Sequence, residues 1–142
     1  MESGQNLTTE TIVQLLRDHD IQPSAQRVAV AEFVLQTDEH PSADRILSGI
    51  QTSFPMISRA TVYNTLRLFV ERGLLREVKL GASSAVYDSN TEKHHHLIDE
   101  ETGEIHDIPW ESVDVCRVDQ LEGFEIHEYQ VVIKGRRART SE

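Results

Sequence analysis

The sequence predicts an α+β protein in which an N-terminal winged helix-turn-helix is followed by a small α/β domain. Up to about residue 73 the apolar side chains recur at helical spacing, and a hairpin pattern follows directly. After Asn90 the pattern changes to a second hairpin, a short helix and a last strand. We therefore place the winged helix at residues 1–88, a hinge at 89–93 and the α/β domain at 94–142.

Four helices are predicted in the first part of the chain. The first carries Ile12, Leu15 and Leu16 at helical spacing. Each of the other three follows a serine whose side-chain oxygen can accept a backbone N–H at the start of a helix: Ser24, Ser42 and Ser58. The fourth helix ends before Gly73, because glycine readily adopts the positive φ found just after a helix.

A two-stranded wing is predicted after the fourth helix. It pairs residues 74–80 with residues 85–88 through a turn at 81–83. Helices followed directly by such a hairpin are typical of a winged helix-turn-helix.

The α/β domain is predicted to be too small to stand alone. Its segments are a strand at 94–99, a turn at 101–103, a strand at 104–108, a short helix with Val115, Val118 and Leu121 that ends at Gly123, and a strand at 124–134. Such a unit has an exposed sheet edge and little core, so we expect a homodimer that forms through the sheet.

Net charge gives a misleading first indication of the partner. The chain has 24 acidic and 14 basic side chains, a net charge of −10, which argues against nucleic acid. Thirteen of the acidic and only six of the basic side chains lie in residues 91–142, however. Residues 55–80 hold five basic and two acidic side chains, and this local excess of positive charge leaves DNA as a candidate partner.

Several classes of protein are excluded by composition. No apolar stretch approaches the roughly 18 residues that a membrane helix needs, and the N-terminus lacks the pattern of a secretory signal. The one cysteine, Cys116, excludes an internal disulfide and a zinc site built from several cysteines. We expect a cytoplasmic protein with no membrane partner.

The fourth helix is predicted to read DNA. If it buries Val62, Leu66 and Phe69, the opposite side presents residue types that recognise bases in the major groove: Arg59, Ala60, Tyr63, Asn64 and Arg67. Basic side chains that follow could hold phosphates: Arg72, Arg76 or Lys79. The alternative is a structural three-helix module whose arginines are only a solvated face.

A metal site is predicted from three consecutive histidines. In a strand, His94 and His96 point to one face, and either register of the hairpin puts Asp107 on that same face. Asp88, at the end of the wing, and His40, before the third helix, are further candidate ligands. Imidazole and carboxylate ligands without thiolate suit Fe(II), Mn(II), zinc or nickel.

Two further interpretations of the histidines stay open. His95 points to the other face, where a second metal site would use Asp114 and His127, although solvation is the simpler reading. The set His94, His96 and Asp107 would also suit a small non-haem iron enzyme, but that function leaves the basic helix and its wing unused.

The sequence resembles the ferric uptake regulator (Fur) superfamily of bacterial metalloregulators from about Ile12 to Gly135. The resemblance rests on five motifs in a fixed order: Pro23-Ser24-Ala25-Gln26-Arg27, His40-Pro41-Ser42-Ala43-Asp44, the helix Ser58 to Leu66, Tyr87-Asp88, and His94-x-His96 with Asp107. It implies a homodimeric repressor of operator DNA that is not an enzyme, with a metal site at the hinge between its two domains.

The resemblance also implies a ligand set and a signal. By position, the regulatory ligands would be His40, Asp88, His94, His96 and Asp107, and Arg27 would join the DNA contacts. Aspartate at position 107 is similar to the peroxide-sensing branch, in which Fe(II) reacts with peroxide, Mn(II) is an insensitive corepressor and oxidative-stress or iron genes are controlled. The triple histidine is also similar to the iron-response branch, which uses haem, so iron, zinc or haem sensing stays open.

Three departures from the family pattern matter. Members usually hold a structural zinc with two Cys-x-x-Cys pairs, but Asp99 and Thr102 stand at the first pair and residues 134–139 contain no cysteine, so no such zinc is expected. Gln22 replaces a basic residue that often enters the minor groove. Asn64 replaces the arginine of iron-uptake repressors, as in peroxide sensors, so the operator preference stays open.

Overall fold

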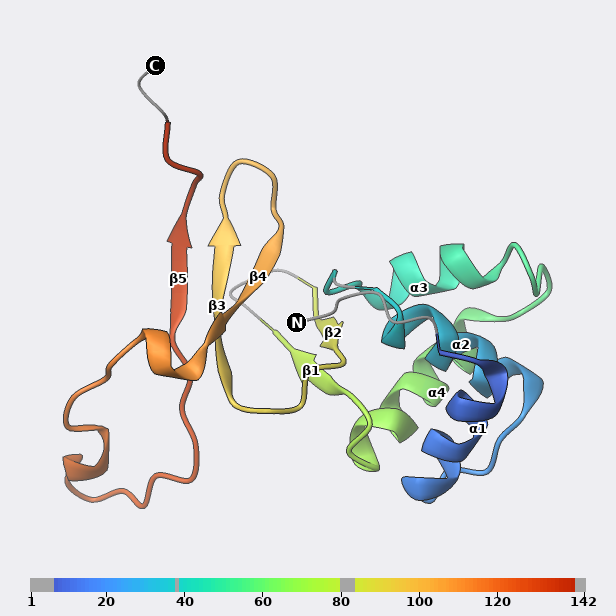
Figure 1. Cartoon of the computed structure of the whole chain (residues 1–142), viewed down its shortest axis with the longest axis horizontal. Coiled ribbons are helices and arrows are strands. Elements are labelled where there is room, and N and C mark those ends of the chain that lie inside the picture. Colours follow the sequence, from blue (N-terminus) through green and yellow to red (C-terminus); the bar gives the residue numbers. More distant parts are fainter. Residues whose placement is uncertain (1–6, 38, 80–83, 140–142) are drawn as a thin grey trace. The chain divides into compact units, whose positions relative to one another are not determined.

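The computed structural model describes residues 7–37, 39–79 and 84–139. The chain divides into two compact units, Met1–Thr91 and Glu92–Glu142, and each is described by itself (Figure 1). The division lies inside the 89–93 stretch. Among the described residues, no helix combines the length and the apolar character that crossing a membrane requires.

The described residues of the first unit form four helices and a two-stranded sheet. Its elements in chain order are α1 (Thr9–Asp18), α2 (Ala25–Leu35), α3 (Ala43–Ile50), α4 (Arg59–Glu71), β1 (Arg76–Val78) and β2 (Val86–Asp88). The predicted helices and wing are thus present, with shorter wing strands than expected. The predicted wing turn at 81–83 lies outside the described residues.

The predicted serine caps are confirmed. In each case the hydroxyl oxygen accepts the N–H of the residue three positions on, as Ser58 does from Thr61 at 3.1 Å. At the other end of α4, Gly73 has φ +82°, and the N–H of Leu74 donates to the carbonyl of Phe69. These bonds satisfy backbone groups that a helix end would otherwise leave unpaired.

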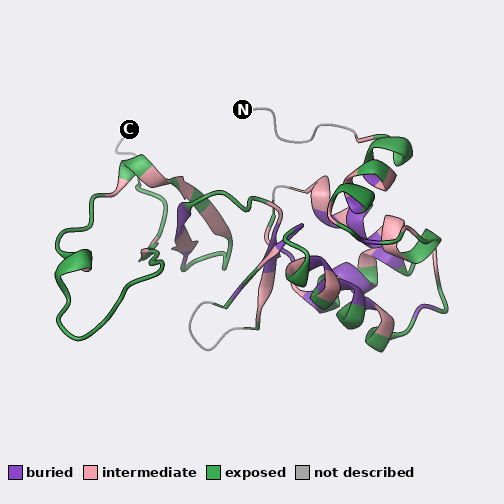
Figure 2. Cartoon of the chain, turned by 90° about the horizontal axis from the view of Figure 1, so that it is seen from below, coloured by how far each residue is buried: buried purple, intermediate pink, exposed green. Residues whose placement is uncertain are grey.

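The core of the first unit lies between its helices (Figure 2). Fully buried side chains from α1, α2, α3 and α4 meet there: Ile12, Leu16, Val30, Ile46, Leu66 and Phe69. On α4 the buried positions alternate with exposed ones at helical spacing, so the helix keeps a solvent-facing side along its whole length.

The second unit is built on a three-stranded sheet. Its strands are β3 (His94–Asp99), β4 (Ile105–Pro109) and β5 (Val132–Gly135), in the order β4-β3-β5. β3 pairs antiparallel with β4 and parallel with β5, and His96 lies directly opposite Asp107. The predicted hairpin and its parity are therefore confirmed.

The segment between β4 and β5 differs from the prediction. The expected helix before Gly123 is only two short 3-10 turns, Trp110–Ser112 and Val118–Gln120, and the expected strand at 124–134 is regular only from Val132. Val115, Leu121 and Phe124 stay exposed in this segment, so the described residues of the unit do not bury the apolar face that a helix here would present (Figure 2).

Candidate metal centre and nucleic-acid interface

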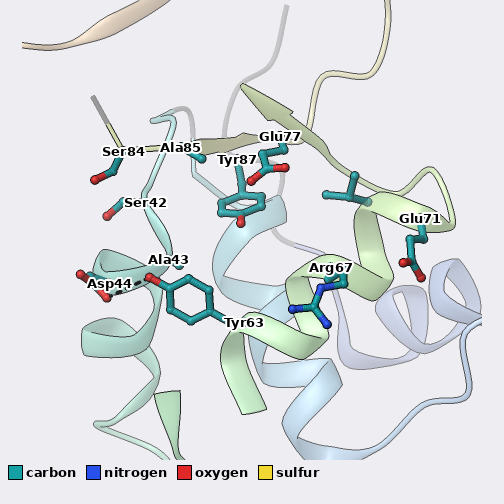
Figure 3. Close-up of a pocket in the computed structure, with 11 residues that line it drawn as sticks. Ser42, Ala43, Asp44, Tyr63, Arg67, Glu71, Glu77, Ser84, Ala85 and Tyr87 are labelled. Carbon is teal, nitrogen blue, oxygen red and sulfur yellow. Dashed lines mark hydrogen bonds between the residues drawn. The ribbon is translucent and has the colours of Figure 1, made fainter. Parts of the chain in front are cut away.

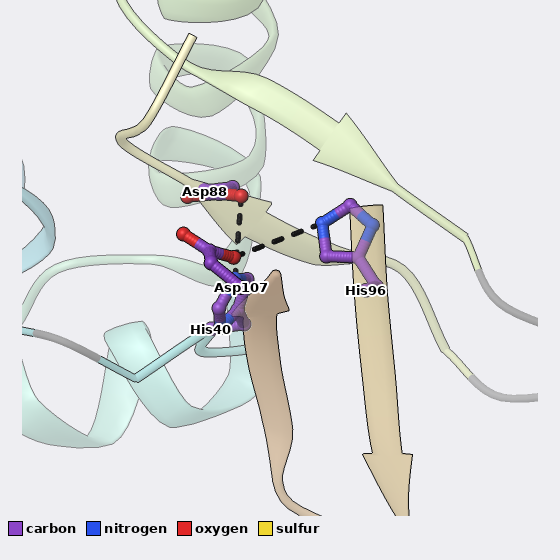
Figure 4. A group of neighbouring side chains, drawn as sticks. All are labelled: His40, Asp88, His96 and Asp107. Atoms are coloured by element: carbon purple, nitrogen blue, oxygen red, sulfur yellow. Dashed lines mark ion pairs between the residues drawn. The ribbon is translucent and has the colours of Figure 1, made fainter. Parts of the chain in front are cut away.

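A first histidine–carboxylate pair lies in the helical unit. The N–H of Tyr87 donates to the carbonyl of Pro41 at 2.9 Å, and Ser42 and Val86 form an antiparallel bridge. The same register, carried two residues on, places His40 opposite Asp88. His40 Nε2 lies 3.2 Å from Asp88 Oδ2, and both side chains are almost fully buried (Figure 4).

A second group of ligands lies in the sheet unit. Asp107 Oδ1 is 3.4 Å from His94 Nε2 and 3.9 Å from His96 Nε2 (Figure 4 shows His96 and Asp107). Both histidine side chains are nearly buried, whereas the Asp107 side chain is 34% exposed. Two imidazole nitrogens thus converge on one carboxylate oxygen, which is the arrangement that the strand parity predicted.

The other ring nitrogens of these two histidines have oxygen partners. His94 Nδ1 lies 2.6 Å from the carbonyl oxygen of Glu92, and His96 Nδ1 lies 3.0 Å from Gln130 Oε1. Both partners are acceptors, so they favour the tautomer in which Nδ1 carries the proton and Nε2 is left to bind an ion. Metal-binding histidines usually have such an outer partner, so the donor set fits a divalent ion.

The structure thus gives two half-sites, one in each unit. The first half-site is His40 and Asp88, and the second is His94, His96 and Asp107. The first half-site offers two nitrogen and oxygen ligands, and the second offers three. Mn(II) or Fe(II) takes about five or six ligands, so neither half-site fills the coordination of the ion by itself.

The second candidate cluster is not assembled. Among the described residues, no group of candidate ligands contains His95, Asp114 or His127. The Val131 N–H donates to His95 Nδ1 at 2.9 Å, and the buried ring stacks on Trp110 with centroids 4.4 Å apart. His95 therefore packs as a core residue in this chain.

Another group of candidate ligands lies at the turn of the β3–β4 hairpin: Asp99, Glu104 and His106. The guanidinium of Arg137 lies 3.9 Å from Asp99 Oδ2 and 3.8 Å from Glu104 Oε1. A cationic side chain already balances both carboxylates, so this group is read as an ion-pair network.

The side of α4 opposite the core carries the predicted DNA-reading residues. All five are exposed: Arg59, Ala60, Tyr63, Asn64 and Arg67. Arg27 and Asn64 line one groove, between the start of α2 and α4. Tyr63 and Arg67 line a separate hollow of about 360 Å³ between α3, α4 and the wing (Figure 3).

The chain matches a known protein family over most of its length. A model of the ferric uptake regulator family matches residues 18–134. The chain belongs to the ferric uptake regulator (Fur) family. Members of this family are transcriptional regulators.

Several Fur-family proteins are similar over nearly the whole chain. The peroxide-responsive repressor PerR of Staphylococcus aureus is 34% identical over 137 residues, 95% of this chain and 92% of that protein. The Campylobacter jejuni peroxide stress regulator matches with a TM-score of 0.66 at 25% identity, covering 91% of this chain and 98% of that one. The Pseudomonas aeruginosa ferric uptake regulator with manganese has a TM-score of 0.67 at 21% identity and covers 89% and 97%, which shows the shared fold.

Two groups that contact the candidate ligands were not predicted from sequence. They are the Glu92 carbonyl and the Gln130 side chain, the outer partners of His94 and His96. A backbone carbonyl leaves no signal in a sequence. Gln130 reaches the site through the parallel pairing of β5 with β3, in which His96 lies opposite Val132, and no local pattern predicts that pairing.

Proposed function

We propose that this chain is a metal-dependent, peroxide-responsive transcriptional repressor that binds operator DNA as a homodimer. The observation that carries the proposal is the pair of half-sites, one in the unit with the DNA-reading helix and one in the sheet unit. The similarity to proteins named peroxide-responsive repressors supports the same function.

The proposed mechanism is a clamp. One Mn(II) or Fe(II) ion would take His40 and Asp88 from the first unit and His94, His96 and Asp107 from the second. Joining the two units would fix the spacing of the two α4 helices in a dimer, so that both fit successive turns of the DNA major groove. Loss of any ligand would release that constraint.

Within each half-site the chain's own residues orient the ligands before the ion arrives. The Asn90 N–H donates to Asp88 Oδ1 at 2.9 Å, while Oδ2 faces His40. Glu92 and Gln130 set the tautomers of His94 and His96. Preset ligands lose less conformational entropy on binding, so the half-sites favour metal without large rearrangement inside either unit.

Fe(II), when bound, would reduce peroxide and bring about oxidation of a histidine that binds it, whereas Mn(II) would not react in this way. An oxidised imidazole is a poorer ligand, so the clamp would open and the operator would be released. Zinc also fits nitrogen and oxygen ligands and would occupy the site in vitro. Cytoplasmic location follows from this function as part of the proposal.

The test measures DNA binding with each metal. An operator is first selected from random duplexes with the Mn(II)-loaded full chain. We expect tight binding with Mn(II) or Fe(II), loss of binding on adding peroxide only with Fe(II), and a mass gain of one oxygen on the peptide that contains His94 and His96. Peroxide-insensitive binding with Fe(II), or binding that responds only to zinc or haem, would contradict the proposed signal. Metal-independent binding would contradict the clamp.

A further inference from the structure

The acidic residue Asp44 lies against two predicted DNA-reading side chains of the first unit. It is in the first turn of α3, two residues after the cap Ser42, and α3 packs against α4. Arg59 and Tyr63 stand four residues apart on α4 and therefore on the same side of that helix.

One oxygen of Asp44 serves both side chains. The Arg59 guanidinium and the Tyr63 hydroxyl each donate to Asp44 Oδ1, the second at 3.4 Å (Figure 3 shows Asp44 and Tyr63). This carboxylate raises the pKa of Arg59 above its usual value, chiefly through the hydrogen bond. The contact thereby favours one arrangement of two flexible side chains that are expected to enter the groove.

The contact is weak enough for DNA to replace it. The Arg59 and Asp44 side chains are 61% and 65% exposed, and ion pairs in water change an equilibrium by less than about fivefold. A guanine edge that accepts both guanidinium hydrogens in a defined geometry can compete with Asp44. A phosphate, which attracts any nearby cation regardless of sequence, must approach a carboxylate to reach Arg59.

We propose that Asp44 is a specificity-determining positioning residue, which orients Arg59 and Tyr63 for base contacts and weakens sequence-independent binding. The inference rests on the proposed DNA-binding function. It goes beyond that function because it assigns the selectivity of α4 to an acidic side chain on the preceding helix.

The test compares Asp44→Asn with Asp18→Asn, an exposed position on α1 that makes the same change in charge. Affinities of the Mn(II)-loaded full chain are measured for the selected operator and for a random-sequence duplex. We expect Asp44→Asn to raise affinity for the random duplex by about three- to fivefold and affinity for the operator by less. Asp18→Asn should change both equally.

Two readouts separate positioning from a purely structural role. Operator selection with Asp44→Asn should show a relaxed base preference at one base pair in each half of the operator. The melting temperature of the protein should stay unchanged. The effect of Asp44→Asn on the ratio of operator affinity to random-duplex affinity should disappear in a protein that also carries Arg59→Ala and Tyr63→Phe.

Three results would overturn the inference. They are equal changes on both duplexes, an unchanged base preference, and an effect that persists without Arg59 and the Tyr63 hydroxyl. If the wild-type chain binds no duplex with any metal, the proposed function itself fails. Selective binding that is indifferent to Asp44 would overturn this inference alone.

Discussion

Asp107 links the two histidines of the second half-site, because its Oδ1 faces Nε2 of both His94 and His96. Replacing it with alanine removes a ligand and also the charge that favours a cation near the two imidazoles. We expect Asp107→Ala to lower Mn(II) affinity by at least about tenfold and to lower metal-stimulated operator binding, with dimerisation unchanged. Calorimetric titration of Mn(II) and a gel-shift titration measure the two effects.

Asp114→Ala is the matched control for Asp107→Ala, since it removes an exposed carboxylate of the same unit that lies outside the candidate ligand groups. It should leave Mn(II) affinity and operator binding unchanged. Metal-stimulated binding that survives Asp107→Ala would argue against the clamp.

Gln130 acts on the same site without facing the ion. Its Oε1 holds the Nδ1 proton of His96, so its loss lets the imidazole rotate or change tautomer. We expect Gln130→Ala to lower Mn(II) affinity by about 10- to 100-fold, the usual effect of removing an outer partner, while Gln120→Ala has no effect. Equal Mn(II) affinities for the wild type and Gln130→Ala would show that the ring is oriented by its backbone alone.

At the scale of elements, local signals were sufficient in the helical unit. The caps Ser24, Ser42 and Ser58 and the end of α4 at Gly73 depend on groups within a few residues, and all are confirmed. The prediction of strands β3 and β4 also depended on a local signal, the turn at 101–103 between them. The prediction of a helix around Val118 was wrong. Only a 3-10 turn forms there, and the apolar side chains of Val115 and Leu121 stay exposed.

The turn between β3 and β4 carries its own electrostatic support. The backbone N–H groups of Glu101 and Thr102 donate to Asp99 Oδ1 and hold the pKa of this carboxyl below its usual range, with Arg137 adding to the effect. A carboxyl whose pKa is lowered by folding stabilises the native state above its unfolded pKa. That contribution to stability is lost as the pH falls through the pKa that the carboxyl has in the folded state.

We therefore expect Asp99→Asn to lower the melting temperature at pH 7, and the difference from wild type to narrow below about pH 4. Thermal unfolding followed by circular dichroism at several pH values measures this. Asp119→Asn, at an exposed position in the second 3-10 turn, is the control and should melt like the wild type at pH 7. A difference that stays constant between pH 7 and pH 3 would mean that the charge of Asp99 does not contribute.

At the scale of the whole molecule, a contact between candidate ligands could be predicted only where the two residues lie close together in the sequence. Strand parity alone joined His94, His96 and Asp107 within one hairpin. His40 faces Asp88 only through a bridge between the α2–α3 connection and the wing, and no periodicity predicts it. There the resemblance to a family supplied what local physics could not. Whether one ion joins the two half-sites stays a prediction, for which Asp107→Ala provides the test.

The exposed apolar residues between β4 and β5 point to a second copy of the chain. They are Val115, Leu121, Phe124, Ile126 and Tyr129, and Val132 at the start of β5 is exposed as well. So many exposed apolar side chains favour association, and in a dimer the small sheet unit would gain the core that it lacks alone. In a dimer, the two α4 helices would contact both halves of an operator together, which would multiply the affinity.

Phe124 is 77% exposed, so a glutamate there would not disturb the single chain but would place a charge in the dimer interface. We expect Phe124→Glu to change the sedimentation-equilibrium mass from twice 16.2 kDa toward 16.2 kDa and to weaken operator binding by about 100-fold or more. Met56→Glu, at a 93% exposed position of the helical unit, should remain dimeric. A Phe124→Glu protein that stays dimeric would place the interface elsewhere. A monomer that keeps full operator affinity would show that one reading helix is enough.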